Sequence, residues 1–121
     1  MSSSFEQPIY DGAAALRDAI AKDDPAVLAP MIIGAALYEE DFDVVYPACV
    51  RLSSHGDEIV RGNAVLGFGH LARLFGRLGD EGPEIVRRSL EDSSSYVRGQ
   101  GHAAASDLEH FLGLQIRQRK E

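Results

Sequence analysis

The sequence predicts an all-α fold in which helical hairpins stack side by side. Val60-Arg61-Gly62 returns as Val97-Arg98-Gly99, and the same offset of 37 residues aligns Leu71 with Leu108. Within both copies, apolar residues recur at the spacing of three and four that is typical of one helical face. Clusters of glycine, proline and serine mark where the helices end and begin. Because a period of this size indicates hairpins that each bury an apolar face against the next, we expect a short α–α superhelix of about three hairpins.

The first hairpin is predicted at about 11–38. A helix over about 11–22 is rich in alanine and carries Leu16 on its apolar side. A second apolar stretch follows Asp24, and an offset of about 33 residues aligns it with the repeat that contains Val60. This match is looser than the one between the two later copies, so the hairpin is inferred mainly from its apolar spacing.

The second hairpin is predicted at about 41–76. Asp41 or Asp43 can cap a first helix, because a side-chain carboxylate accepts the N–H groups that the first helical turn leaves unpaired. A turn then leads to Asp57, which can cap a second helix at about 57–76.

The third hairpin is predicted at about 80–113. Pro83 suits the first turn of a helix, where no backbone N–H donor is needed, and this helix is expected to end near Asp92. Residues 93–95 are serines, whose hydroxyls can cap the following helix. The remaining stretch, 114–121, is polar and basic, and we expect it to form a tail beyond the packed hairpins.

Length and composition bound the class of protein. The chain of 121 residues suits a single domain over 1–121, and its 45% apolar and 26% charged residues are ordinary for a soluble globular protein. No stretch approaches the roughly 18 apolar residues of a membrane span. The first six residues lack the features of a secretory signal, and Cys49 has no second cysteine to pair with. We therefore expect a cytoplasmic protein.

Charge is distributed unevenly along the chain. The net charge is −7, but residues 1–60 hold 11 acidic and 3 basic side chains, whereas residues 61–121 hold 8 acidic and 9 basic ones. An acidic surface repels nucleic-acid phosphates and anionic lipids, and it accelerates encounter with a basic protein. We expect a basic protein partner, and neither nucleic acid nor a membrane. The alternative is that the acids only keep a small domain soluble.

Patterns for metal binding or catalysis are weak. His102 and His110 lie two helical turns apart, about 12 Å along the axis, and cannot share one ion. Cys49 falls on the apolar side of its helix, where a lone cysteine behaves as a core residue. Ser106, Asp107 and His110 lie within one helix and lack an oxyanion hole at a strand-to-helix turn. We therefore predict no metal, no cofactor, no small-molecule substrate and no enzymatic activity.

Two repeated features predict contacts between hairpins. Arg61 and Arg98 occupy the same place in the repeat, so we expect each to pair with an acid of an adjacent unit. Five glycines inside the two clearest helices each cost about 1 kcal/mol relative to alanine, which close approach of neighbouring helices can offset. These glycines are at positions 62, 67, 69, 99 and 101.

The segment 38–46 is the most suggestive surface element. It interleaves acidic with aromatic residues around an expected turn between helices. Aromatic side chains anchor interfaces and acids steer a basic partner, so the combination favours protein recognition. The alternative is that Phe42 and Tyr38 are core residues and the acids only cap helices. The predicted partner-binding residues are Tyr38, Glu39, Glu40, Asp41, Asp43 and Tyr46.

The repeated pattern resembles the second helix of a HEAT-type repeat. The match covers 41–113, and its residues are Asp57, Val60, Arg61, Ala64, Gly67 and Gly69. A narrower resemblance, carried by 33–41 and 59–73, is to small bacterial HEAT-like proteins. These include immunity proteins of contact-dependent growth inhibition and of related polymorphic toxin systems.

The resemblance implies a cytoplasmic protein that binds the toxic carboxy-terminal domain of a delivered effector, often a nuclease, and blocks it. A nuclease presents basic surface to nucleic acid, and an acidic immunity protein can occupy that surface. Two other classes remain open. One is a structural adaptor that joins other proteins. The other is a phycobilin lyase-like or DNA glycosylase-like HEAT enzyme, which the lack of tryptophan and the acidic net charge disfavour.

Overall fold

The structure consists of helices and confirms the predicted all-α class. It is a computed structural model that describes residues 10–117, and no strand occurs in that range. In chain order the helices are α1 (Ala13–Lys22), α2 (Pro25–Tyr38), α3 (Phe42–Leu52), α4 (Glu58–Phe75), α5 (Glu81–Ser89) and α6 (Ser95–Leu112).

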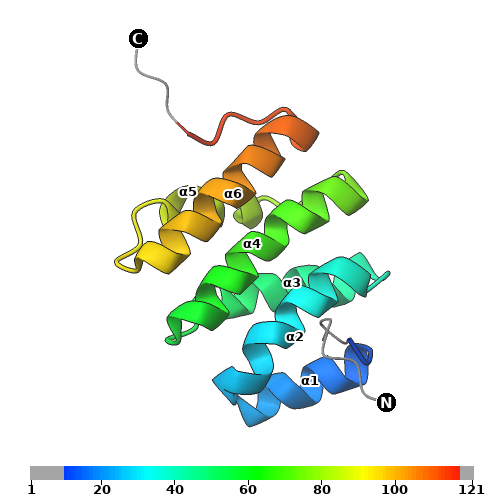
Figure 1. Cartoon of the computed structure of the whole chain (residues 1–121). Helices are drawn as coiled ribbons and strands as arrows, with labels where there is room; N and C mark the ends of the chain where they lie inside the picture. Colours follow the sequence, from blue (N-terminus) through cyan, green and yellow to red (C-terminus); the bar gives the residue numbers. More distant parts are fainter. Residues whose placement is uncertain (1–9, 118–121) are drawn as a thin grey trace, which may run out of the picture.

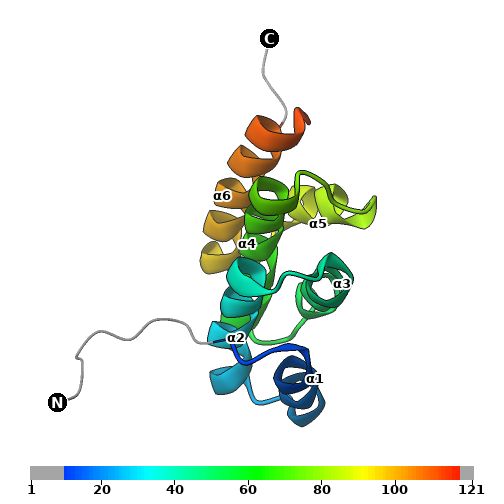
Figure 2. The ribbon, with the colours of Figure 1, turned by 90° about the vertical axis from the view of Figure 1, so that its right-hand side faces the viewer.

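The helices form two layers (Figure 1, Figure 2). α2, α4 and α6 lie side by side in one layer, and α1, α3 and α5 form the other. α4 is central: it packs against α2 and α6 in its own layer and against α3 and α5 in the other. Successive helices contact each other as the pairs α1–α2, α3–α4 and α5–α6, which lie within the three hairpin ranges expected from the sequence. In the described part of the chain, no helix has the length and apolar character needed to cross a bilayer.

Local sequence signals determine where the helices begin. Asp41 caps α3, Asp57 caps α4 and Ser94 caps α6, each by accepting a backbone N–H from the first helical turn. The predicted end of one helix is less accurate: α5 ends at Ser89 rather than near Asp92. The next three residues continue with tighter i→i−3 hydrogen bonds of 3.0 to 3.3 Å instead of α-helical ones.

The core follows α4 through the middle of the molecule. Val60, Phe68 and Leu71 on α4 are fully buried, and side chains of every other helix pack into the same apolar cluster. Cys49 of α3 is part of this core, as predicted. Burial raises the pKa of its thiol to about 12, so the sulfur stays protonated and acts as an apolar group.

Glycines allow the helices to approach closely at four of the five predicted positions. A Cβ added at Gly67 would lie 2.8 Å from the Cys49 sulfur, closer than any real contact. The four glycines that face such contacts are at positions 62, 67, 69 and 101. The prediction is wrong for Gly99, which is exposed on α6, the last helix of its layer, and where a Cβ would meet nothing within 4 Å.

The carboxy-terminal segment is not entirely a free tail. Ile116 is buried in the core, and the Glu109 carboxylate of α6 accepts the backbone N–H groups of Ile116 and Arg117 at 3.3 and 3.0 Å. The expectation of a tail over 114–121 is therefore wrong as far as Arg117, since one apolar side chain among polar neighbours is enough to dock the segment. The rest of that stretch, 118–121, lies outside the described residues.

Candidate protein-interaction surface

The predicted recognition segment forms the turn between α2 and α3. Tyr38 is the last residue of α2 and is 53% exposed, and Glu40 and Asp43 are exposed beside it. Asp41 is exposed too, but one of its oxygens accepts the Asp43 N–H at 3.0 Å as the cap of α3. Over the range 10–117, none of these three acids forms an ion pair. Their negative charge is therefore open to a partner.

Glu39 belongs to the same turn but has a structural role. Its carboxylate accepts the Tyr10 hydroxyl at 2.5 Å and the Asp41 N–H at 2.9 Å. These hydrogen bonds, that of Tyr10 first, hold the pKa of the Glu39 carboxyl below its usual value because they favour the ionised form. Burial, with the Glu39 bond, raises the pKa of the Tyr10 hydroxyl. Glu39 thus ties the start of the described chain to the end of α2.

Tyr46 is buried, so its prediction as a partner-binding residue is wrong. It is 8% exposed, and its ring stacks on that of Phe42 with the centroids 5.0 Å apart. Its hydroxyl donates to Glu81 Oε1 at 2.7 Å and accepts the Gly82 N–H at 3.0 Å, both from the start of α5. The core alternative therefore holds for Phe42 and is wrong for Tyr38, which is the one of the three aromatics that remains on the surface.

Exposed apolar side chains are concentrated on α2, α4 and α6, the helices of one layer. Among residues 10–117, every exposed large apolar side chain lies on one of these helices, apart from Leu114, which follows α6. None lies on α1, α3 or α5. The six on helices are Val27, Tyr38, Ile59, Leu74, Tyr96 and Phe111. These three helices therefore offer exposed apolar contacts that α1, α3 and α5 do not.

A polar cluster that was not predicted from the sequence crosses this layer. Asn63 of α4 is buried, and its Nδ2 donates to the Ala29 carbonyl of α2 at 2.9 Å. Its Oδ1 accepts the Tyr96 hydroxyl of α6 at 2.5 Å and Gln100 Nε2 at 3.3 Å. Asn63 and Gln100 occupy the same repeat position, 37 residues apart, which is the signal that could have identified them.

Charged residues also join the hairpins at the end where α4 and α6 begin. Arg61 Nε and Nη2 donate to the two oxygens of Asp92, each at 2.9 Å, which confirms the predicted pairing between repeats. The Arg61 bonds are the main reason that the pKa of Asp92 is lowered. Arg98 donates instead to the Asp92 backbone carbonyl at 2.7 Å, so its predicted ion pair with an adjacent unit is not formed.

A histidine links the first two hairpins at the same end. His55 Nδ1 accepts the Asp57 N–H at 2.9 Å, so the neutral ring carries its proton on Nε2 and donates to Asp23 Oδ1 at 2.6 Å. Burial lowers the pKa of another histidine, His70 of α4.

In the part of the chain that the structure describes, no three His, Cys, Asp or Glu side chains are grouped so that they could hold a metal ion.

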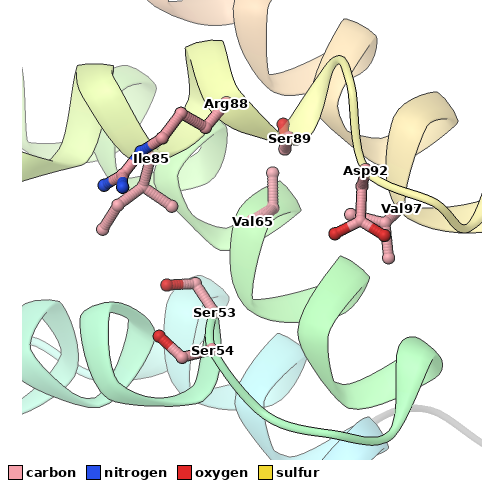
Figure 3. A pocket seen from close by; sticks show the side chains of 8 residues that line it. All are labelled: Ser53, Ser54, Val65, Ile85, Arg88, Ser89, Asp92 and Val97. Carbon is pink, nitrogen blue, oxygen red and sulfur yellow. The ribbon is translucent and has the colours of Figure 1, made fainter.

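A crevice of about 200 Å³ lies in the layer of α1, α3 and α5, between the carboxy-terminal end of α3 and α5 (Figure 3). Val65 and Val97 line its apolar part, and Ser54 and Arg88 contribute polar groups. The Asp92 carboxylate also reaches it, but that group is already paired with an arginine. The lining combines one cation, one carboxylate and the carboxy-terminal ends of two helices, which carry partial negative charge. These opposing charges favour neither an anionic nor a cationic ligand.

No protein-family model matches this chain, and neither a curated protein nor a solved structure matches it. The interpretation of the surface therefore depends on its geometry and on the resemblance carried by the repeat.

Proposed function

We propose that this chain is a HEAT-like immunity protein that binds one cognate toxin domain in the cytoplasm and neutralises it. The observation that carries the proposal is the α2–α3 turn, where Tyr38 is exposed beside Glu40 and Asp43, whose charges no described side chain neutralises. A toxin of the contact-dependent growth inhibition type, with a nuclease domain, has the basic surface that such a turn attracts.

The two properties of the surface have separate roles in the proposed complex. Carboxylates accelerate the encounter with a basic domain, whereas aromatic and aliphatic side chains slow its dissociation. The layer of α2, α4 and α6 provides the apolar part next to the acidic turn. An immunity protein seated on the nucleic-acid surface of a nuclease would exclude the substrate without any chemistry of its own.

The proposal predicts that the gene directly upstream encodes a toxin, and the test is calorimetry with the carboxy-terminal domain of that upstream-encoded toxin. We expect a 1:1 complex and loss of the toxin's nuclease activity in the mixture. Replacing Glu40 by Gln and Asp43 by Asn together should weaken binding about tenfold, and Tyr38→Ala should do the same, as expected of interface anchors. Asp41 and Glu39 are left intact because they cap α3 and hold Tyr10.

The matched control is the double variant Glu84→Gln and Glu91→Gln, which removes the same charge from exposed positions in and just after α5. Its dissociation constant for the toxin domain should be within about twofold of that of the unaltered protein, since charges outside the interface contribute little to binding. Absence of binding to the upstream-encoded domain would defeat the immunity proposal. If the two double variants lose affinity equally, the interface does not include the α2–α3 turn.

A further inference from the structure

Tyr96, in the first turn of α6, is exposed and yet held rigidly. It is 36% exposed, while its hydroxyl donates to Asn63 Oδ1 at 2.5 Å and accepts from Gln100 Nε2 at 3.0 Å. One side of its ring rests on α4 at Gly62, where an added Cβ would be 2.8 Å from two ring carbons. Because the ring is already fixed, a partner that packs on its open side loses little side-chain entropy.

The support under Tyr96 extends across the whole layer. Asn63, which accepts the Tyr96 hydroxyl, is 4% exposed and is itself anchored to the Ala29 carbonyl of α2. Three helices therefore determine the position of one aromatic ring. Such a cluster is fully satisfied, since the described residues include no buried side-chain polar atom without a hydrogen-bond partner.

The groups next to Tyr96 are apolar and acidic. Ile59 lies one helical turn before Gly62 and Asn63, the two α4 residues that Tyr96 contacts, and is 40% exposed. Glu58 lies one helical turn before Gly62 on the same side of α4, and its carboxylate accepts the Ser94 hydroxyl at the start of α6. An open crevice of about 600 Å³ separates the beginnings of these two helices, and its lining includes Glu58.

The charge of this region is negative. Asp57 and Glu58 both line the crevice, and neither forms an ion pair within residues 10–117. The cation in the lining, Arg61, is committed to Asp92 through two hydrogen bonds. A phosphate would be repelled by these carboxylates, whereas a guanidinium or ammonium group would be attracted.

We propose that Ile59, Tyr96 and Glu58 form a second docking surface, which binds a polypeptide segment carrying an apolar side chain next to an arginine or lysine. The apolar side chain packs on Ile59 and the Tyr96 ring, and the cation lies between that ring and the Glu58 carboxylate. This surface is at the opposite end of α4 from the α2–α3 turn, because Phe42 contacts Phe75 at the far end of α4. The inference rests on the proposed function and names the chemistry of a further part of the partner.

The first test uses peptides, so it does not depend on the toxin. The ¹⁵N-labelled protein is titrated with an acetylated peptide amide of sequence Arg-Leu-Arg-Phe and with the charge-reversed peptide Glu-Leu-Glu-Phe. We expect the basic peptide alone to shift the amide signals of residues 58–62 and 94–100. Tyr96→Ala and Glu58→Gln should each weaken this binding about tenfold.

Variants at Tyr96 also separate docking from folding. Tyr96→Phe loses both hydroxyl bonds but keeps the ring. The dissociation constant of the peptide should therefore rise by less than about threefold. The matched control is Phe111→Ala, which removes another exposed aromatic from the far end of α6 and should leave peptide binding unchanged. Shifts located elsewhere, equal binding of the acidic peptide, or full binding by folded Tyr96→Ala would overturn the proposal.

The upstream-encoded toxin domain then separates this inference from the function on which it rests. If that domain binds and Tyr96→Ala and Glu58→Gln weaken the complex, both proposals are supported. If the domain binds and neither variant has an effect, the second docking surface is wrong while the immunity function stands. If the domain does not bind at all, the immunity function is wrong, and the peptide titration alone decides whether this surface recognises basic apolar segments.

Discussion

Two glycines show how strongly a single residue depends on what packs against it. Gly67 and Gly99 both lie inside long helices of the same layer. A Cβ at Gly67 would lie 2.8 Å from the Cys49 sulfur and 3.4 Å from the Ala36 Cβ, whereas one at Gly99 would meet nothing within 4 Å. The two positions therefore have the same helix propensity, but Gly67 is tightly packed against its neighbours and Gly99 is not packed at all.

Alanine at these positions should change stability in opposite directions. We expect Gly67→Ala to lower the free energy of unfolding by about 1 to 3 kcal/mol, because the core there has no room for a methyl group. Gly99→Ala should raise it by about 0.5 to 1 kcal/mol, because alanine restricts the unfolded chain and favours the helix. Urea unfolding of both variants measures the difference, and an increase in stability for Gly67→Ala would contradict the close packing of α3 against α4.

At the scale of elements, α6 is joined to the segment that follows it by one carboxylate. Glu109 accepts the N–H groups of Ile116 and Arg117, and it pairs with the Arg117 guanidinium at 2.5 Å. These contacts, with the Arg117 side chain first, lower the pKa of Glu109 from 4.5 to about 2. The ionised carboxylate is therefore more stable in the folded chain than in the unfolded one.

This linkage predicts how stability depends on pH. Because the folded-state pKa of Glu109 is below its unfolded value, its contribution is complete above pH 4.5 and is lost as the pH falls toward 2. In Arg117→Gln the pKa should return toward its usual value, so this variant has less stability to lose in that window. Thermal unfolding at pH 7, 4.5 and 3 should show the two proteins converging as the pH falls. A difference that stays constant with pH would exclude the linkage, since the other carboxylates are the same in both proteins.

At the scale of the whole molecule, acidic and apolar side chains have separate roles in the proposed complex, although they lie next to each other at the α2–α3 turn. The acidic front half of the chain includes the α2–α3 turn, and the exposed apolar side chains lie on α2, α4 and α6. Electrostatic steering by the first and short-range packing by the second should therefore respond differently to salt.

Salt dependence of association tests this separation for the complex with the upstream-encoded toxin domain. Raising the salt concentration from 0.05 to 0.5 M should lower the association rate constant about tenfold while the dissociation rate changes little. The double variant Glu40→Gln and Asp43→Asn should start from a slower rate and show a flatter salt dependence. Stopped-flow mixing measures both, and parallel salt curves for the two proteins would place the steering charges elsewhere.

Prediction from the sequence succeeds where the cause is local and fails where it is distant. The caps at Asp41 and Asp57 act on N–H groups two or three residues away, so the helix starts were predictable. Tyr46 was misplaced because its hydroxyl partner, Glu81, is 35 residues away and belongs to another hairpin. The pairing of Arg61 with an acid of an adjacent hairpin was predictable, because Arg61 and Arg98 share one repeat position. That the acid is Asp92, and that Arg98 pairs with no acid within residues 10–117, was decided by the packing.

The sequence by itself determined that this chain forms helices, where α3, α4 and α6 start, and that their apolar sides must be covered by neighbouring hairpins. These properties follow from capping groups and apolar spacing, which act over a few residues. Only the tertiary structure decided that Tyr38 is exposed while Tyr46 is buried, that Tyr96 is held by Asn63, and that Gly99 meets nothing. Each of these depends on which helix lies alongside, and the end of a stack removes a neighbour without changing the local repeat.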